Sequence, residues 1–310
     1  MRIDLRIAKK LAENVSSAKP MLNAFDERFF PGKDEEKEVV TSYFLFMTAI
    51  DHRTRIGSTY QKEIKGELFF GSDLLFRLAK LKYDVDPNFY IPKNMADISL
   101  NDFKEVFMPE RVTLENPEVR VALLRDLGSK LMILHDGKSL NLLDKAKGKI
   151  KGNPKDPGLL ELLKTFIAYS DPVEKKSFLL MKFLKKRGIF TPKDLENEQV
   201  PVDNHLLRIA IRTGLLRLEK SWFPLLRNER DSTLEEDIVL RMMARTAFKI
   251  VAKEAKISPF LLDDFLWSHG RFICTNENPN CKECSIRTAC LGEGSWFSWA
   301  NEPFNENWYY

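Results

Sequence analysis

The feature that most constrains this chain is the distribution of its cysteines. All four cysteines of the 310-residue sequence fall within 17 residues, as Cys274, Cys281, Cys284 and Cys290. A disulfide framework would spread cysteines along the chain, whereas a tight group in an otherwise cysteine-free chain is typical of a metal or iron–sulfur site. The gaps of six, two and five residues include a single short pair, while structural zinc sites usually have two. Four unevenly spaced thiolates suit the four irons of a [4Fe–4S] cluster, so we predict this cofactor, with zinc as the alternative.

The rest of the sequence predicts a helical protein of two domains. Hydrophobic residues make up 44% of the chain and charged residues 30%, which is ordinary for a globular protein of this length. Helical periodicity dominates and strand-like alternation is scarce, so the predicted fold class is all-α. The expected helices cover residues 3–15, 37–51, 72–82, 99–107, 117–135, 158–169, 174–187, 204–217, 234–256 and 259–269.

Charge and hydropathy limit the surroundings of the protein. No apolar run approaches the ~18 residues of a membrane span, and the first residues lack the apolar segment of a secretory signal. We therefore expect a cytoplasmic protein. The net charge of +4, from 49 basic and 45 acidic residues, permits a polyanionic partner without requiring one.

A second motif lies about seventy residues before the cysteines, and the two motifs together point to a family. The segment from Val202 to Gly214 reads V-D-N-H-L-L-R-I-A-I-R-T-G, and His269 to Cys274 reads H-G-R-F-I-C. This combination resembles the endonuclease III-like helix-hairpin-helix DNA glycosylases. They carry V-D-x-H-x-x-R-x-x-x-R-x-G, and then H-G-R-aromatic-x-C leading into the same cysteine spacing. The resemblance covers roughly residues 112–292 and is firm over 202–290.

The resemblance implies particular roles for particular residues. It makes Asp203 the catalytic carboxylate and Lys176 the lysine that forms a Schiff base. A carboxylate at a helix N-terminus is kept ionised and can stabilise the positive charge that builds on a sugar as its N-glycosidic bond breaks. A purely structural N-cap is the other interpretation of Asp203, and a solvated helix start is that of Lys176. Further candidate contacts to nucleic acid or to a flipped base are His52, Arg53, Lys175, His205 and Arg271.

The chain departs from the family pattern in two places. Pro172 and Glu174 stand where the family's hairpin turn has glycines, whose N–H groups contact a DNA phosphate. Proline lacks the N–H group and glutamate adds a negative charge, so the usual phosphate contact is in question. The six residues between Cys274 and Cys281 also contain no lysine or arginine.

The resemblance implies a two-domain architecture and a function in DNA repair. We expect a six-helix barrel with the hairpin at 31–199, and an iron–sulfur domain built from 1–30 and 200–310, with the aromatic C-terminal segment packed over it. The expected function is a base-excision DNA N-glycosylase, with abasic-site lyase activity through Lys176 as a second step. The protein would be a monomer, associated with the nucleoid, that acts on damaged or modified DNA. The alternatives are a nucleoside or nucleotide N-glycohydrolase and a non-catalytic nucleic-acid-binding module on the same scaffold.

Overall fold

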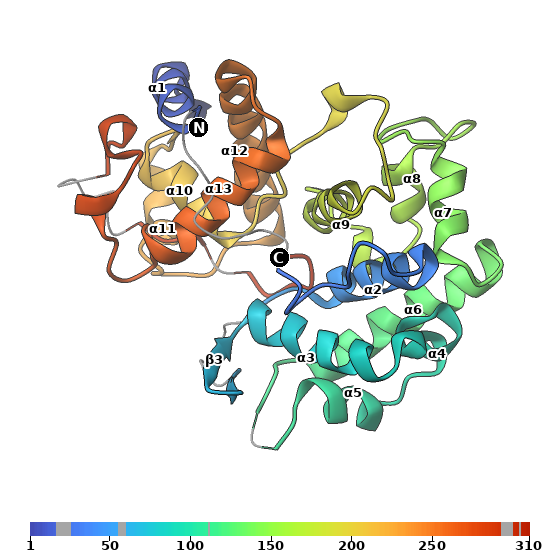
Figure 1. Cartoon of the computed structure of the whole chain (residues 1–310). Helices are drawn as coiled ribbons and strands as arrows, with labels where there is room; N and C mark the ends of the chain where they lie inside the picture. The colour runs from blue at the N-terminus through green and yellow to red at the C-terminus, as the bar shows by residue number, and fades with distance from the viewer. Residues whose placement is uncertain (17–25, 55–59, 111, 293–299, 304) are drawn as a thin grey trace. The chain divides into compact units, whose positions relative to one another are not determined.

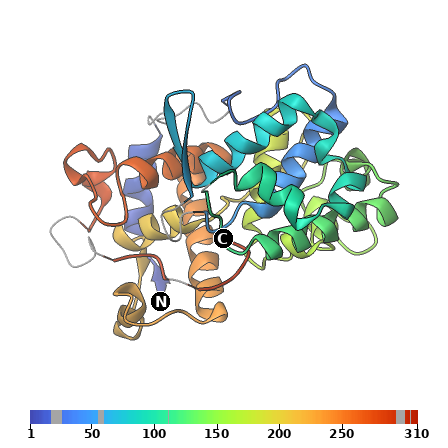
Figure 2. The same cartoon turned by 90° about the horizontal axis from the view of Figure 1, so that it is seen from below.

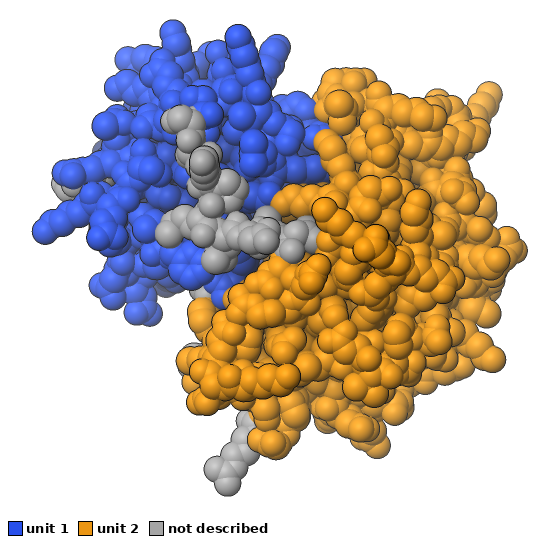
Figure 3. Space-filling model, viewed as in Figure 1, with its two compact units in different colours: residues 1–24, 198–307 blue, residues 25–197, 308–310 orange. Residues whose placement is uncertain are grey.

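The chain forms two compact units in a computed structural model that describes residues 1–16, 26–54, 60–110, 112–292, 300–303 and 305–310. Unit 1 consists of residues 1–24 and 198–307, and unit 2 of residues 25–197 and 308–310 (Figure 3). Each unit is therefore built from segments that are distant in the sequence. Among the described helices, none is long and apolar enough to cross a membrane.

Unit 2 is helical, with one short hairpin (Figure 1). Its strands β2 (Gln61–Ile64) and β3 (Glu67–Phe70) pair antiparallel, with Gln61 opposite Phe70 and Ile64 opposite Glu67 (Figure 2). Its helices are α2 (Lys37–Ile50), α3 (Ser72–Val85), α4 (Pro92–Asp97), α5 (Leu100–Phe107), α6 (Pro117–Leu134), α7 (Ser139–Ala146), α8 (Leu159–Leu163) and α9 (Lys175–Lys186), with 3₁₀ turns at Pro87–Tyr90, Ile167–Tyr169 and Leu195–Asn197.

Helix α2 forms the centre of unit 2. Every residue from Val39 to Ile50 is buried, because α6, α7 and α9 all pack against this helix. A helix that is apolar on all sides is stable only in such a position. Phe44 of this helix forms an aromatic cluster with Phe30, Phe76 and Phe183, in which the ring centroids of contacting pairs are 5.1–6.0 Å apart. The C-terminal end of α2 is thus a rigid point on which a site can be built.

Unit 1 combines the first helix of the chain with its last long ones. Its elements are β1 (Arg2–Ile3), α1 (Leu5–Val15), α10 (Asn204–Arg212), β4 (Leu216–Arg217), α11 (Phe223–Leu226), α12 (Leu234–Ala255) and α13 (Pro259–Phe272), with 3₁₀ turns at Lys220–Trp222, Cys281–Glu283 and Arg287–Ala289. Helix α1 packs on α12, and α10 packs on both α12 and α13. Strand β1 pairs antiparallel with β4, which fixes the start of the chain beside the end of α10.

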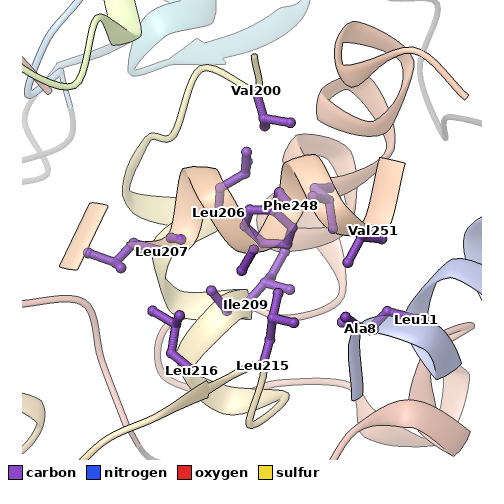
Figure 4. Close-up of a cluster of buried hydrophobic side chains, with 14 of the residues drawn as sticks. Ala8, Leu11, Val200, Leu206, Leu207, Ile209, Leu215, Leu216, Phe248 and Val251 are labelled. Carbon is purple, nitrogen blue, oxygen red and sulfur yellow. The ribbon is translucent and has the colours of Figure 1, made fainter. Parts of the chain in front are cut away.

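The core of unit 1 forms around α10. Leu206, Leu207 and Ile209 of this helix belong to one buried cluster with Phe248 and Val251 of α12 and Leu11 of α1 (Figure 4). All six side chains are buried. Burial of a side chain of this size contributes about 1.5–3 kcal/mol. This packing holds the ends of α10, where the V-D-x-H motif begins and ends.

Several elements differ from those that periodicity predicts. The single helix expected at 158–169 is broken after α8, because Phe166 is extended and the next N–H group, that of Ile167, donates to Asp126 Oδ2 at 2.8 Å. The helix expected at 204–217 ends at Arg212, because Gly214 has φ +76° and its missing Cβ would lie 2.9 Å from the Leu291 side chain. Helices α4, α7 and α11 and the hairpin β2–β3 were not among the expected elements.

The last three residues of the chain were also expected elsewhere. Trp308–Tyr310 group with unit 2 rather than with the cysteine-containing unit 1. Tyr310 is 5% exposed, and its hydroxyl donates to Asp171 Oδ1 at 2.7 Å. The other aromatic residues of this segment, Trp296, Phe297, Trp299 and Phe304, lie outside the described residues.

Candidate active site and cysteine loop

Lys176 lies at the start of α9, in a fully buried position. Its Nζ donates to the backbone oxygens of Ala49 and Trp308, both at 2.6 Å, and lies 3.3 Å from Nδ1 of His52. Burial moves the pKa of Lys176 well below that of an ordinary lysine, and the charges of Lys175 and Arg120 act in the same direction, against Asp51 and Asp171. The site therefore favours a neutral amine, which is the nucleophilic form.

Three basic side chains contact the C-terminal end of α2. Lys176 donates to the carbonyl oxygen of Ala49, and Lys175 donates to that of Asp51 at 3.1 Å. Arg120 donates to the carbonyl oxygens of Ile50 and, at 2.6 Å, His52. The last carbonyls of a helix lack partners within the helix and carry partial negative charge, so cations suit them. The side chains that donate to these carbonyls belong to α6 and α9.

His52 and Arg53 have different surroundings. The His52 ring is buried, and its pKa lies well below the usual value because of burial and the charges of Arg120, Lys176 and Lys175. Arg53 is partly exposed, has φ +47°, and donates its backbone N–H to the Tyr310 carbonyl at 3.1 Å. His52 is therefore a neutral ring that faces Lys176.

The turn before α9 is held by one buried aspartate. Asp171 Oδ1 accepts the N–H of Val173 at 2.7 Å, Oδ2 accepts the N–H of Lys175 at 2.6 Å, and the Asp171 carbonyl accepts the N–H of Glu174 at 3.0 Å. Glu174 has φ +61°, the left-handed conformation that glycine adopts easily, and its carboxylate pairs with Lys164 at 2.6 Å. The turn thus keeps the backbone conformation that glycine would give it, but Asp171 accepts the hydrogen bonds of its N–H groups.

Asp203 is the N-cap of α10. Its backbone is extended, and Oδ1 accepts the N–H of Leu206 at 2.9 Å, while the side chain stays partly exposed. Buried Arg241 of α12 contacts both neighbours of Asp203: it donates to Asn204 Oδ1 at 2.6 Å and to the Val202 carbonyl at 3.4 Å. Arg241 is itself paired with buried Asp237, at 2.9 Å. Asp203 therefore lies at a helix start held by Arg241, with Oδ1 of its carboxylate engaged in the cap.

The two arginines of the V-D-x-H motif hold the cysteine loop. Arg208 is 2% exposed and donates to the carbonyls of Cys274 at 2.9 Å and Gly270 at 2.8 Å, with Glu302 as its carboxylate partner at 2.8 Å. One turn later, Arg212 donates to the carbonyl of Thr275 at 2.5 Å. The arginines of one motif thus hold the backbone of the loop that carries the cysteines, which explains why the two sequence motifs occur together.

Gly270 is required where α10 and α13 meet. A Cβ on this residue would lie 2.7 Å from the Cβ of His205 and 3.3 Å from Ile209. The next residue, Arg271, is buried and stacks over the ring of Trp267, at 4.9 Å from its centroid. His205 contacts Arg208 Nη2 through Nδ1 at 2.9 Å. His205 therefore lies in the packing between α10 and α13, while Arg271 stacks on a ring of its own helix, α13.

The four cysteines are half-buried and form no disulfide. Burial raises the pKa of the Cys284 thiol to about 12, with smaller contributions from Cys290, Cys274 and Cys281. The N–H of Gly292 donates to Cys290 Sγ at 3.2 Å, and His269 Nε2 lies 3.3 Å from Cys284 Sγ. In the described part of the chain, no three or more Cys, His, Asp or Glu side chains are arranged to hold a metal ion.

The predicted site residues fall into two groups. Lys175, Lys176, His52 and Arg53 come together in unit 2, while Asp203, His205, Arg271 and the cysteines belong to unit 1. Sequence reasoning missed Arg120 and Asp171. A signal for Arg120 existed, because it lies on the same helical stripe as Leu124, Leu127 and Leu131, all buried. The Asp-Pro pair at 171–172 was a turn signal of the same kind.

Comparison with solved structures shows that the chain has the fold of endonuclease III. A trapped covalent intermediate of endonuclease III with DNA aligns over 94% of this chain and 97% of that one, with a TM-score of 0.53 and 12% identity. The 8-oxoguanine DNA glycosylase Pa-AGOG from Pyrobaculum aerophilum, in complex with 8-oxoguanosine, aligns over 97% of this chain and 100% of that one, with a TM-score of 0.50 and 15% identity. The resemblance that the motifs indicate is thus confirmed at the level of the fold.

Sequence comparison finds one more relative. The chain is 24% identical over 249 residues to the transcriptional activator DEMETER of Arabidopsis thaliana. The match covers 78% of this chain and 11% of that protein, so the chain spans only a small part of its relative. No family model matches the sequence.

Proposed function

We propose that this protein is a DNA N-glycosylase that removes a damaged or modified base and that then cleaves the strand through a lysine Schiff base. The observation that carries the proposal is Lys176: a fully buried amine, depressed in pKa, at the first turn of the helix that follows the hairpin turn. The endonuclease III fold supports it, since a covalent complex of that enzyme with DNA has been trapped. Asp203 would supply the catalytic carboxylate.

The chemistry divides between these two side chains. The lone pair of the neutral Lys176 amine forms a bond to C1′ of the sugar, and the N-glycosidic bond breaks with its electron pair going to the base, which takes a proton from water as it leaves. The carboxylate of Asp203 stabilises the positive charge on the sugar, and the new ammonium loses its proton to water. The ring then opens as O4′ leaves C1′ and takes a proton from water, which gives an iminium. Water accepts a proton from C2′, and the electron pair of that C–H bond expels the 3′ phosphate by β-elimination.

A [4Fe–4S] cluster on Cys274, Cys281, Cys284 and Cys290 belongs to the proposal as a structural group. Cluster ligation places each thiolate on a separate iron, so the four sulfurs need not surround a single point. The loop also offers donors to the sulfurs, as the N–H of Gly292 does to Cys290. Bound there, the cluster would fix the loop that Arg208 and Arg212 hold from the other side, and it would take no part in the reaction.

The hairpin turn favours a second candidate, a nucleoside or nucleotide N-glycohydrolase. Its N–H groups at Val173, Glu174 and Lys175 are all taken by Asp171, so they do not offer a phosphate the usual site. An enzyme that does not grip a duplex could keep Asp203 and lose this contact. A DNA glycosylase with this turn must hold its substrate through other surfaces.

A panel of oligonucleotides with single damaged or modified bases separates these proposals. The glycosylase should release free base from at least one duplex or single strand, and release should weaken steeply with salt because phosphates are contacted. Release from mononucleosides alone would identify the second candidate. No release from any substrate, with binding to DNA intact, would mean that only the scaffold is retained.

A further inference from the structure

Arg120 is a buried cation without a carboxylate among its hydrogen-bond partners in the described residues. It is 1% exposed and lies in the first turn of α6. Its guanidinium donates to the backbone oxygens of Ile50, His52 and Glu115, and its Nη1 lies 3.3 Å from Nδ1 of His52. Burial lowers the pKa of Arg120 to about 10, although the charges of Asp51 and Glu115 act in the opposite direction. Keeping this cation buried is therefore costly, which calls for a reason beyond helix capping.

Arg120 and Lys176 converge on the same atom. Nζ of Lys176 is also 3.3 Å from Nδ1 of His52. A guanidinium can only donate, so Nδ1 of His52 must be the ring's acceptor and Nε2 must carry the proton. A neutral imidazole has one acceptor lone pair, and two donors therefore compete for it.

The competition decides which protonation state of Lys176 fits the site. An ammonium has three N–H groups and needs three acceptors, whereas a neutral amine has two. The carbonyls of Ala49 and Trp308 provide two acceptors at 2.6 Å. If Arg120 takes the lone pair of His52, Lys176 is left with the number of acceptors that the neutral amine requires.

We propose that Arg120 is a positioning residue for Lys176: it occupies the acceptor nitrogen of His52, places a positive charge beside the amine, and so keeps Lys176 neutral and nucleophilic. The inference rests on the proposed role of Lys176. Other charged groups face the amine as well. Lys175 acts in the same direction as Arg120, but its charge is partly offset by Asp51, 3.9 Å away. The charges of Asp51 and Asp171 raise the pKa of Lys176, and the charge of Arg53 lowers the pKa of His52.

The direct test is the titration of Lys176 followed by NMR in protein labelled with ¹³C at lysine Cε, with the signal assigned from Lys176→Gln. In the wild type, Lys176 should titrate well below the ordinary lysine value of about 10.4. Arg120→Gln keeps amide donors for the α2 carbonyls but removes the charge. It should raise the midpoint of Lys176 by roughly one to two pH units, the effect expected at the protein's effective dielectric of a like charge that shares one hydrogen-bond partner with the amine. Arg120→Lys keeps the charge and should leave the midpoint low.

The two variants make the inference falsifiable even if one of them does not fold. An unchanged midpoint in Arg120→Gln, or a raised midpoint in Arg120→Lys, would overturn it. The exposed Lys155 serves as the internal control, and its signal should be the same in all proteins.

Activity provides an independent comparison. The rate of covalent trapping on abasic-site DNA should reach its plateau at a higher pH in Arg120→Gln than in the wild type, a shift that mere loosening of the fold would not cause. If Lys176 titrates as expected but the wild type traps no DNA, the inference about Arg120 holds and the proposed lyase function fails. If trapping succeeds while the midpoint stays in place, only the inference fails.

Discussion

Lys176 and Asp203 illustrate how much of a residue's chemistry comes from its neighbours. Both are common types at helix starts, and Asp203 does cap α10 through Leu206. Capping and catalysis do not exclude each other, because a cap uses one carboxylate oxygen and leaves the second available. For Lys176, by contrast, a solvated helix start is ruled out by its complete burial. Sequence spacing could place both residues, but only packing shows which of them is shielded from water.

Replacement of Asp203 by asparagine separates the two roles of this side chain. Asparagine caps helices about as well as aspartate, so the free energy of unfolding should change by less than about 0.5 kcal/mol. Base release should fall by orders of magnitude, because the charge that stabilises the sugar cation is lost. Urea unfolding and single-turnover base release measure the two effects. An active Asp203→Asn protein would reduce Asp203 to a helix cap.

At the scale of elements, the turn before α9 and the end of α2 act together. The turn positions Lys176, and the carbonyls at the end of α2 receive its amine along with Arg120 and Lys175. The family pattern could indicate the turn, and it correctly singled out Glu174 as a position of glycine type, where φ is +61°. It could not indicate that Asp171 accepts the hydrogen bonds of the turn's N–H groups, because this depends on a side-chain rotamer and on Tyr310, 139 residues away.

Removal of the Asp171 side chain should destabilise this turn. Asp171→Ala deletes a buried acceptor of two N–H groups and of the Tyr310 hydroxyl, and leaves those donors without partners. The expected loss of stability is roughly 2–4 kcal/mol. Ser170→Ala, at the exposed neighbouring position, is the matched control and should cost much less. Equal unfolding midpoints for the two variants would show that Asp171 does not hold the turn.

The C-terminal residues should control access to Lys176. The Trp308 carbonyl contacts the amine, and Tyr310 is anchored on Asp171 and on the N–H of Arg53. A chain that stops after Asn307 should therefore expose Lys176. Its acylation by a small amine-reactive reagent, followed by peptide mass spectrometry, should accelerate at least about tenfold, since local opening of the segment is no longer required. Lys155 should react equally in both chains. Equal rates at Lys176 would mean that this segment does not cover it.

At the scale of the whole molecule, the sequence motifs predict unit 1 better than unit 2. The V-D-x-H motif and the cysteines meet inside unit 1, because Arg208 and Arg212 hold the Cys274 loop. A motif search could find both, since they are contiguous in sequence. Unit 2 was harder to predict: its hairpin β2–β3 and its helices α4 and α7 are short, and short elements give weak periodicity.

The cysteine loop should make unit 1 dependent on iron. Purified protein should absorb broadly in the visible range and contain about four irons per chain. Removal of the iron, or Cys281→Ser, should lower the unfolding temperature, because metal binding and folding of such a loop are coupled. Iron analysis and thermal unfolding test this together. Colourless protein with one zinc per chain would contradict the cluster.

Borohydride trapping on abasic-site DNA, with the cross-linked peptide identified by mass spectrometry, tests the role of Lys176 most directly. The trapped peptide should carry its modification at Lys176. Lys176→Gln should abolish trapping and Lys175→Gln should only weaken it. The wild-type rate should rise with pH through the lowered pKa of Lys176 and stay flat above it, because only the neutral amine attacks. A cross-link at Lys175, or trapping that survives Lys176→Gln, would contradict the proposed nucleophile.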